Sequence, residues 1–174
     1  MNPLFRQHSR SWKDNRFVYP VISRRSKGLS VGINLNPDKA CNFDCVYCSV
    51  DRTVPAASGE VDLAIVRDEL DALLDQIDSR SFWSAPPFDT VPDPLRRFND
   101  VAFSGDGEPT ASAHFPAACG LAVDRLAAHG HATDTKIVVI TNATLLDRPR
   151  SRRCDRRGSR LPFELRGGPG AWRW

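Results

Sequence analysis

The chain has 174 residues, of which 41% are hydrophobic and 26% charged, and it carries a formal net charge of +3. This composition is that of an ordinary globular protein and excludes a collagen-like, coiled-coil or fully disordered chain. The length suits one domain better than two. No uncharged apolar run approaches the roughly 20 residues that cross a bilayer, and the polar first residues do not resemble a signal peptide. We therefore expect a cytoplasmic protein with no membrane partner.

Positive charge is concentrated in the last part of the sequence. Residues 148–174 contain nine arginines and two acidic residues, which gives this segment a net charge of +7. Residues 1–147 carry a net charge of −4. A basic domain often binds nucleic acid, but here the basic character does not extend to the body of the protein.

The predicted elements follow one another as strand, helix, strand, helix and strand. Residues 1–28 form a lead-in with one short strand. From residue 29, apolar and polar side chains alternate up to residue 35, as they do in a strand. The later elements are an amphipathic helix at 63–77, a strand at 101–103, an Ala-rich helix at 115–128 and a β-branched strand at 137–140. This order predicts an α/β fold with right-handed crossovers and a parallel sheet.

Three polar segments each follow one of these strands. They span residues 36–50, 104–110 and 141–144. Ligands of α/β proteins bind at the carboxyl ends of the strands. We therefore expect the functional residues in these three segments.

The first segment contains Cys41, Cys45 and Cys48 in the spacing C-x3-C-x2-C. Disulfides are disfavoured because the number is odd and nothing indicates secretion. A structural zinc site needs four ligands, and the fourth would be Cys119, Cys154 or a distant histidine. Three thiolates suit a [4Fe–4S] cluster better, because they ligate three irons and leave the fourth open to another ligand.

The segment Cys41–Cys48, with its aromatic residue before the third cysteine, resembles the cluster motif of the radical S-adenosylmethionine superfamily. The segment 103–110, Phe-Ser-Gly-Asp-Gly-Glu-Pro-Thr, resembles that family's glycine-rich segment, in which Gly105 and Gly107 permit close backbone approach and Glu108 faces the methionine ammonium. By the same resemblance, Tyr47 lies near adenine and Asn142 lines the cofactor pocket. Local roles in turns and loop packing are the alternatives for these residues.

The resemblance implies the N-terminal portion, about three βα units, of a partial (βα)6 radical S-adenosylmethionine barrel. The cluster cysteines would be Cys41, Cys45 and Cys48, and S-adenosyl-L-methionine would be cleaved to methionine and a 5′-deoxyadenosyl radical. The partners implied are a flavodoxin or ferredoxin as reductant and an unidentified substrate. Within the superfamily, the motifs look closest to the group with the tRNA wybutosine-synthesis enzymes, which makes tRNA one weakly indicated substrate.

The resemblance covers residues 29–147 and then stops. Residues 148–174 have the Arg, Gly, Pro and Trp enrichment of a shifted reading frame, so we expect a truncated or frameshifted core whose activity is impaired. A genuine RNA- or phosphate-binding tail is the competing interpretation. The alternative for the whole chain is a non-catalytic zinc module with a nucleic-acid-binding tail.

Overall fold

The structure is a computed structural model that describes residues 12–46, 48, 50–56, 59–146 and 163–166. It contains one mixed sheet in the order β1-β2-β3-β4-β5. The first pair of strands is antiparallel and the other three pairs are parallel. The strands are β1 (Val18–Ser23), β2 (Gly28–Ile33), β3 (Phe98–Phe103), β4 (Lys136–Ile140) and β5 (Phe163–Arg166).

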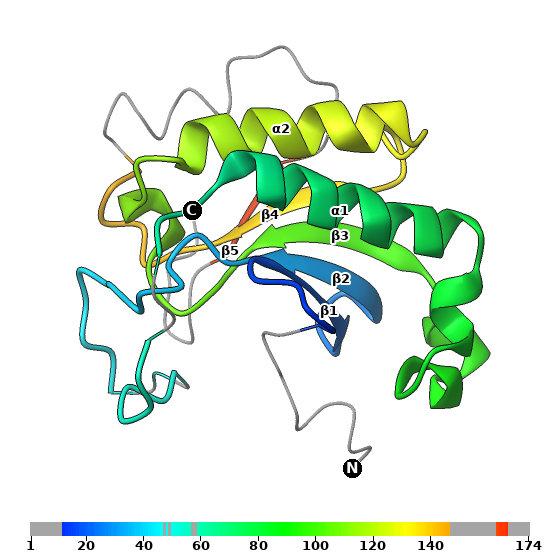
Figure 1. The fold of residues 1–174 in the computed structure, drawn as a ribbon, viewed down its shortest axis with the longest axis horizontal. Coiled ribbons are helices and arrows are strands. Elements are labelled where there is room, and N and C mark those ends of the chain that lie inside the picture. The colour runs from blue at the N-terminus through cyan, green and yellow to red at the C-terminus, as the bar shows by residue number, and fades with distance from the viewer. Residues whose placement is uncertain (1–11, 47, 49, 57–58, 147–162, 167–174) are drawn as a thin grey trace.

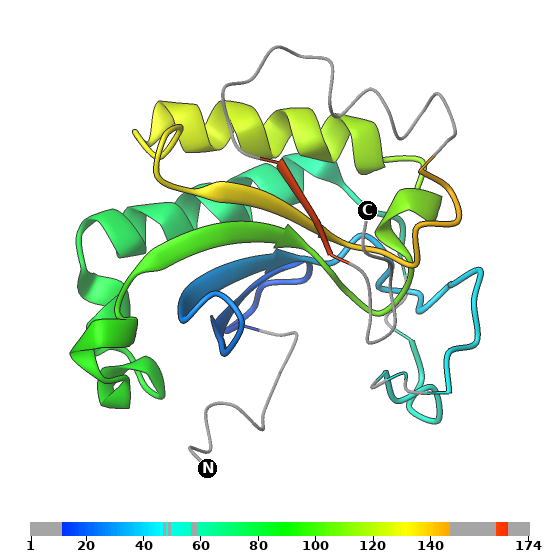
Figure 2. The same ribbon diagram turned by 180° about the vertical axis from the view of Figure 1, so that it is seen from behind.

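Helices α1 (Leu63–Asp78) and α2 (Phe115–Ala128) lie side by side on one face of this sheet (Figures 1 and 2). Helix α1 begins after Asp62, whose side chain accepts a hydrogen bond from the Ala64 amide at 2.8 Å. Such an N-cap satisfies an amide that the helix itself leaves unpaired. The apolar stripe of α1 is buried against the sheet, through Val66, Leu70, Leu73, Leu74 and Ile77. The hydrophobic core therefore lies between the helices and one side of the strands.

Alternation along the strands gives the sheet two different faces. Val31, Val101 and Ile137 stand in register on adjacent strands and are at most 1% exposed beneath the helices. Their neighbours along each strand point to the opposite face, where Tyr19 and Gly32 are paired. No described helix covers this second face, which we call the open face (Figure 2).

Residues 81–98 contain three short 3-10 helices at the end of the molecule away from the cysteine loop (Figure 1). They are η2 (Ser81–Ser84), η3 (Phe88–Thr90) and η4 (Asp93–Leu95). Phe82 and Phe88 pack with Trp12, at ring-centroid distances of 5.8 and 5.2 Å. The apolar residues of this proline-rich segment thus extend the core beyond the end of the sheet.

The predicted helices at 63–77 and 115–128 and the predicted strands are confirmed with small shifts of their ends. The partial (βα)6 barrel is wrong. The sheet is open, its strands follow the order of the sequence, and the β1–β2 hairpin begins it with an antiparallel pair. Both helices lie on one face of this small mixed sheet, and nothing described closes it into a barrel.

Strand β5 falls within the segment 148–174, which we expected to lie outside the fold. Its residues pair in parallel with β4, from Ile137 opposite Phe163 to Ile140 opposite Arg166. The rest of that segment is outside the described residues, so the boundary near residue 147 stays a prediction. In the part of the chain that the structure describes, no helix has the length and apolar character needed to cross a membrane.

Candidate functional site

The three polar segments predicted to carry function meet at one edge of the sheet. Strands β2, β3 and β4 are parallel, so their carboxyl ends lie together. The cysteine loop, which we define as residues 34–56, leaves β2 there and extends away from the sheet (Figure 1). Hydrogen bonds between the segments then fix their relative positions.

Asn34 joins the start of the cysteine loop to the segment after β3. Its side chain is buried, with only 3% exposure of the residue. The Nδ2 group donates to Asp106 Oδ2 at 2.8 Å, and Oδ1 accepts from the amides of Asn36 and Asp106 at 3.0 and 3.2 Å. One buried amide therefore joins the two loops by two hydrogen bonds and makes a third within the cysteine loop.

Glu108 joins the segment after β3 to the end of β4. The residue is 3% exposed. Its Oε1 accepts from the Thr110 amide, the Thr110 hydroxyl and the Thr141 hydroxyl at 3.1, 2.5 and 2.6 Å. Its Oε2 accepts from the Asn142 amide at 2.7 Å. Both carboxylate oxygens are thus occupied by groups of the protein itself.

Asn142 in turn joins the end of β4 to the cysteine loop. Its Nδ2 donates to Asn42 Oδ1 at 3.0 Å, and Asn42 Nδ2 donates to the Thr144 hydroxyl at 2.9 Å. Asn42 directly follows Cys41. The position of the first cysteine is therefore tied to the carboxyl end of β4.

Gly105 and Gly107 lie where the segment after β3 packs closely against the cysteine loop. A Cβ at Gly105 would overlap Asn34 Oδ1, and a Cβ at Gly107 would overlap the carbonyl oxygen of Ala40. The absence of a side chain therefore serves contact between two loops of the protein. Both glycines also line the cavity described below, where their contact with a ligand stays a prediction.

Cys41, Cys45 and Cys48 have free thiols and line one cavity of about 790 Å³ on the open face. Gly105, Gly107, Glu108, Thr141 and Asn142 line the same cavity. The three predicted segments are thus brought together around a common space. The sulfurs are not gathered into a coordination sphere: among the described residues, no three Cys, His, Asp or Glu side chains form a ready metal site.

Two other sequence-predicted residues need separate mention. Tyr47, expected near adenine, lies outside the described residues. Cys119, an alternative fourth zinc ligand, is 1% exposed within the hydrophobic core formed by α2. It does not line the cavity with the other three cysteines.

Lys39 and Arg52 hold the cysteine loop in shape. Lys39 Nζ donates to the carbonyl oxygens of Asp51 and Val54 at 2.5 and 2.8 Å, and Arg52 donates to the carbonyl oxygen of Lys39. The Thr53 hydroxyl and amide donate to the Asp51 carboxylate and lower its pKa. These contacts give the loop local order beyond its cysteines.

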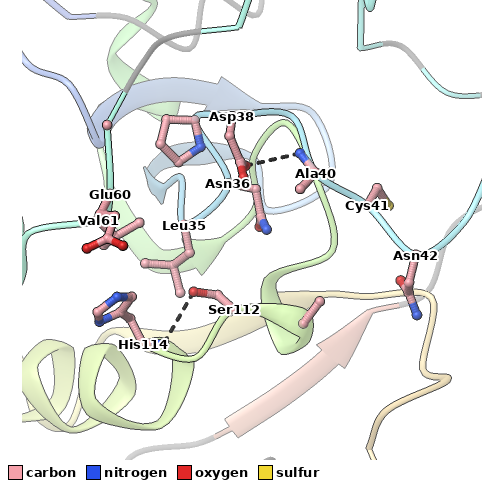
Figure 3. A pocket seen from close by; sticks show the side chains of 13 residues that line it. Leu35, Asn36, Asp38, Ala40, Cys41, Asn42, Glu60, Val61, Ser112 and His114 are labelled. Atoms are coloured by element: carbon pink, nitrogen blue, oxygen red, sulfur yellow. Dashed lines mark hydrogen bonds between the residues drawn. The ribbon is translucent and has the colours of Figure 1, made fainter.

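A second cavity of about 470 Å³ lies on the other side of Cys41, which lines both (Figure 3). Its wall includes Asn36, Glu60 and His114, from the cysteine loop, the approach to α1 and the start of α2. Asn36 is 6% exposed, and its Oδ1 has no hydrogen-bond partner among the described atoms. The first cysteine therefore borders both cavities.

Asn34, Asn42 and Thr141 were missed as site residues by sequence reasoning. Asn42 and Thr141 lie inside two of the predicted segments and Asn34 lies just before the first, and each bonds to a residue more than 30 positions away. The only local signal was their place after a strand, which Asn and Thr share with ordinary loop residues.

Comparison with known proteins places the chain near one curated relative. The chain is 31% identical over 152 residues to UPF0026 protein MJ1312 of Methanocaldococcus jannaschii, an alignment that covers 84% of this chain. The chain spans 37% of the length of that relative. No family model and no solved structure matches the chain.

This comparison corrects the family expected from the motifs. The relative belongs to UPF0026, a distinct family that is not a radical S-adenosylmethionine family. The expected membership of that superfamily, and of its wybutosine-synthesis group, is therefore wrong. The three polar segments nevertheless line one cavity, and a role for them rests on that geometry.

Proposed function

We propose that the cysteine loop binds a [4Fe–4S] cluster and that the adjoining cavity binds S-adenosyl-L-methionine, which the protein cleaves reductively. The observation that supports this most strongly is the shared cavity: all three cysteines line it together with residues 104–108 and 141–142. Three thiolates leave one iron of the cube open to the amino and carboxylate groups of such a ligand. The cavity volume of about 790 Å³ lies in the range of small-molecule sites.

The donor set fits the cluster. Cys41 and Cys48 are exposed and Cys45 is half-buried, so none has to leave the core to bind a metal. The loop is anchored on both sides of the first cysteine, by Asn36 and by Asn42. Between the anchors and Asp51, no described residue belongs to a helix or strand, so the sulfurs can converge without breaking secondary structure.

When bound, the cluster supplies an electron, taken from an external flavodoxin- or ferredoxin-type reductant, that breaks a sulfur–carbon bond of S-adenosyl-L-methionine to give methionine and a 5′-deoxyadenosyl radical. The protein's own residues then have positioning roles. Glu108, whose two oxygens accept hydrogen bonds from the protein itself, holds the Asn142 amide in place. Asn142 holds Asn42 and so fixes the loop next to Cys41. We place the protein in the cytoplasm, where its thiols stay reduced.

The test is anaerobic reconstitution of the full chain with iron and sulfide. We expect a brown protein with about four irons per chain and broad absorption near about 400 nm. Cys45→Ala should lose most of this iron, whereas Cys119→Ala, which removes a sulfur that lies outside the cavity, should retain it. A colourless protein with one zinc and no iron uptake would contradict the cluster and favour the zinc module.

The same cluster-loaded sample tests the second half of the proposal. With dithionite and S-adenosyl-L-methionine, it should release 5′-deoxyadenosine, measured by chromatography against the Cys45→Ala protein. A loaded protein that neither binds nor cleaves S-adenosyl-L-methionine would restrict the function to cluster binding.

A further inference from the structure

The cavity that the cysteines line continues along the open face to the β1–β2 turn. Besides the three cysteines, its wall includes Arg24 and Arg25 in this turn, and Ser23 and Ser30 at the adjoining ends of the two strands. Tyr19 and Gly32 line the cavity at its cysteine end, where the tyrosine ring covers the space that a Cβ at Gly32 would take. One continuous cavity therefore reaches from the thiols of the cysteine loop to the guanidinium groups of the turn. The cavity wall has a further arginine at the cysteine end, Arg52, which donates to the carbonyl oxygen of Lys39.

The two ends differ in charge. Two of the described lining residues are acidic, Asp106 and Glu108, and both lie at the cysteine end. Arg24 and Arg25 are exposed, and no described carboxylate forms an ion pair with either. Asp100, on β3, is buried and accepts a hydrogen bond from the Ser30 hydroxyl. In the sheet it is paired with Lys136 on β4. The turn end of the cavity is therefore positively charged.

The distance along β1 shows how far the turn lies from the cysteine end of the cavity. Tyr19 is at the cysteine end, where its hydroxyl lies 3.0 Å from the Ser104 carbonyl oxygen and 2.9 Å from the Ser104 hydroxyl. Ser23 is four residues further along β1, which at roughly 3.3 Å per residue is about 13 Å away. A phosphate-bearing molecule bound at the turn can therefore lie beside, and not in place of, the S-adenosyl-L-methionine that we propose at the cysteine end.

We propose that this cavity binds a small phosphate-bearing substrate, with the phosphate at Arg24 and Arg25 and the reacting part near the cysteine loop. Guanidinium groups offer several fixed donors that match phosphate oxygens. A polyanion such as RNA requires a long basic surface, whereas these arginines lie at the end of a cavity. The placement of the reacting part rests on the proposed function; the phosphate site does not.

Titration of the full chain with pyrophosphate by calorimetry, before any cluster is loaded, tests the phosphate site. Arg24→Gln/Arg25→Gln should weaken binding about tenfold or more, because two charge-assisted contacts are lost. The matched control is Lys13→Gln/Arg67→Gln, which removes the same charge from side chains that contact residues of α1. The control should bind pyrophosphate within about twofold of the unaltered protein.

Three results would overturn the phosphate site: no saturable binding, equal weakening in the two double variants, or arginine-dependent binding of single-stranded RNA without binding of pyrophosphate. Cluster loading is measured separately on the same variants. Phosphate binding without iron uptake would refute the proposed function and leave the phosphate site standing. Iron uptake without phosphate binding would refute the phosphate site and leave the proposed function standing.

Discussion

At the scale of single residues, the glycines and the glutamate of the segment after β3 turn out to serve contacts within the protein. Gly105 and Gly107 admit Asn34 and Ala40 of the cysteine loop, and Glu108 accepts four hydrogen bonds from the protein itself. The sequence pattern suggested that the same residues face a ligand. Their contacts give them a task that this pattern did not indicate, which is to hold the edge of the sheet in shape around the cavity. The predicted contacts of these residues with a ligand stay a prediction.

Gly107→Ala tests this assignment. The new Cβ would overlap the backbone oxygen of Ala40, which cannot rotate away as a side chain would. We expect the free energy of unfolding to fall by about 2 kcal/mol, as for other substitutions that force extra atoms into a packed site. Urea denaturation measures it, with Ala113→Ser, at an exposed position soon after the segment, as control. Equal stability of the two variants would show that the loops do not need this close approach.

At the scale of elements, helix α1 does more than cover the sheet. Glu69 projects from the helix to the start of β1, where its carboxylate accepts the amides of Arg16, Phe17 and Val18 at 2.6, 2.9 and 2.9 Å. Nothing in the helical periodicity singled out this residue, because an acidic side chain on an amphipathic helix is usually solvated. The three amides precede or begin a strand, so the carboxylate fixes where β1 starts.

Glu69→Ala should therefore destabilise the fold by about 2 kcal/mol, because partly buried amides lose a charged acceptor. Asp68→Ala is the control. It removes an adjacent carboxylate whose side chain is 68% exposed and pairs only with Arg67 among the described residues, so we expect a loss below about 0.5 kcal/mol. Chemical denaturation of both variants gives the comparison. Losses of the same size would mean that charge on α1, and not the bonds to β1, is what matters.

At the scale of the whole molecule, local patterns predicted the elements and not their assembly. The spacing of Leu63, Val66, Leu70, Leu73 and Ile77 identified α1 because a helix depends on near neighbours. The strand that became β3 was predicted only from residue 101, because its first three residues, Phe98 to Asp100, are a strand only through their pairing with β2. The barrel was expected because the two motifs resembled a family of barrels, whereas closure depends on strands that local periodicity cannot describe.

The candidate site, like the fold, could be predicted from the sequence only in part. The three segments could be predicted to meet, because parallel strands bring their carboxyl ends to one edge. The hydrogen bonds that fix these segments could not be predicted, because Asn42 and Asn142 are 100 residues apart and no local pattern indicates that they pair. The arginines of the β1–β2 turn joined the site only through the antiparallel pairing of these strands, which places the turn at the end of the open face.

A cluster of charges links the ends of the two helices and gives the molecule a predicted dependence on pH. Asp78, the last residue of α1, lies 2.9 Å from His129 Nδ1 and 2.7 Å from His131 Nε2, both just beyond α2. Partial burial raises the pKa of Asp78, but the hydrogen bonds to His129 and His131 outweigh it, so that the pKa lies below its ordinary value of 3.8. The folded state therefore binds the Asp78 proton less readily than the unfolded chain does.

A lowered carboxyl pKa stabilises the folded state above the unfolded pKa, and this stabilisation disappears as the pH falls through the folded pKa. The unaltered protein should therefore be more stable than Asp78→Asn at about pH 5, and the difference should shrink towards about pH 3. Urea denaturation at several pH values measures it. Asp75→Asn is the control, because its carboxylate is 76% exposed and 3.9 Å from His129 Nδ1, so a constant, smaller difference is expected. A gap for Asp78→Asn that did not change with pH would show that the neutral hydrogen bonds, and not the charge on Asp78, join the two helices.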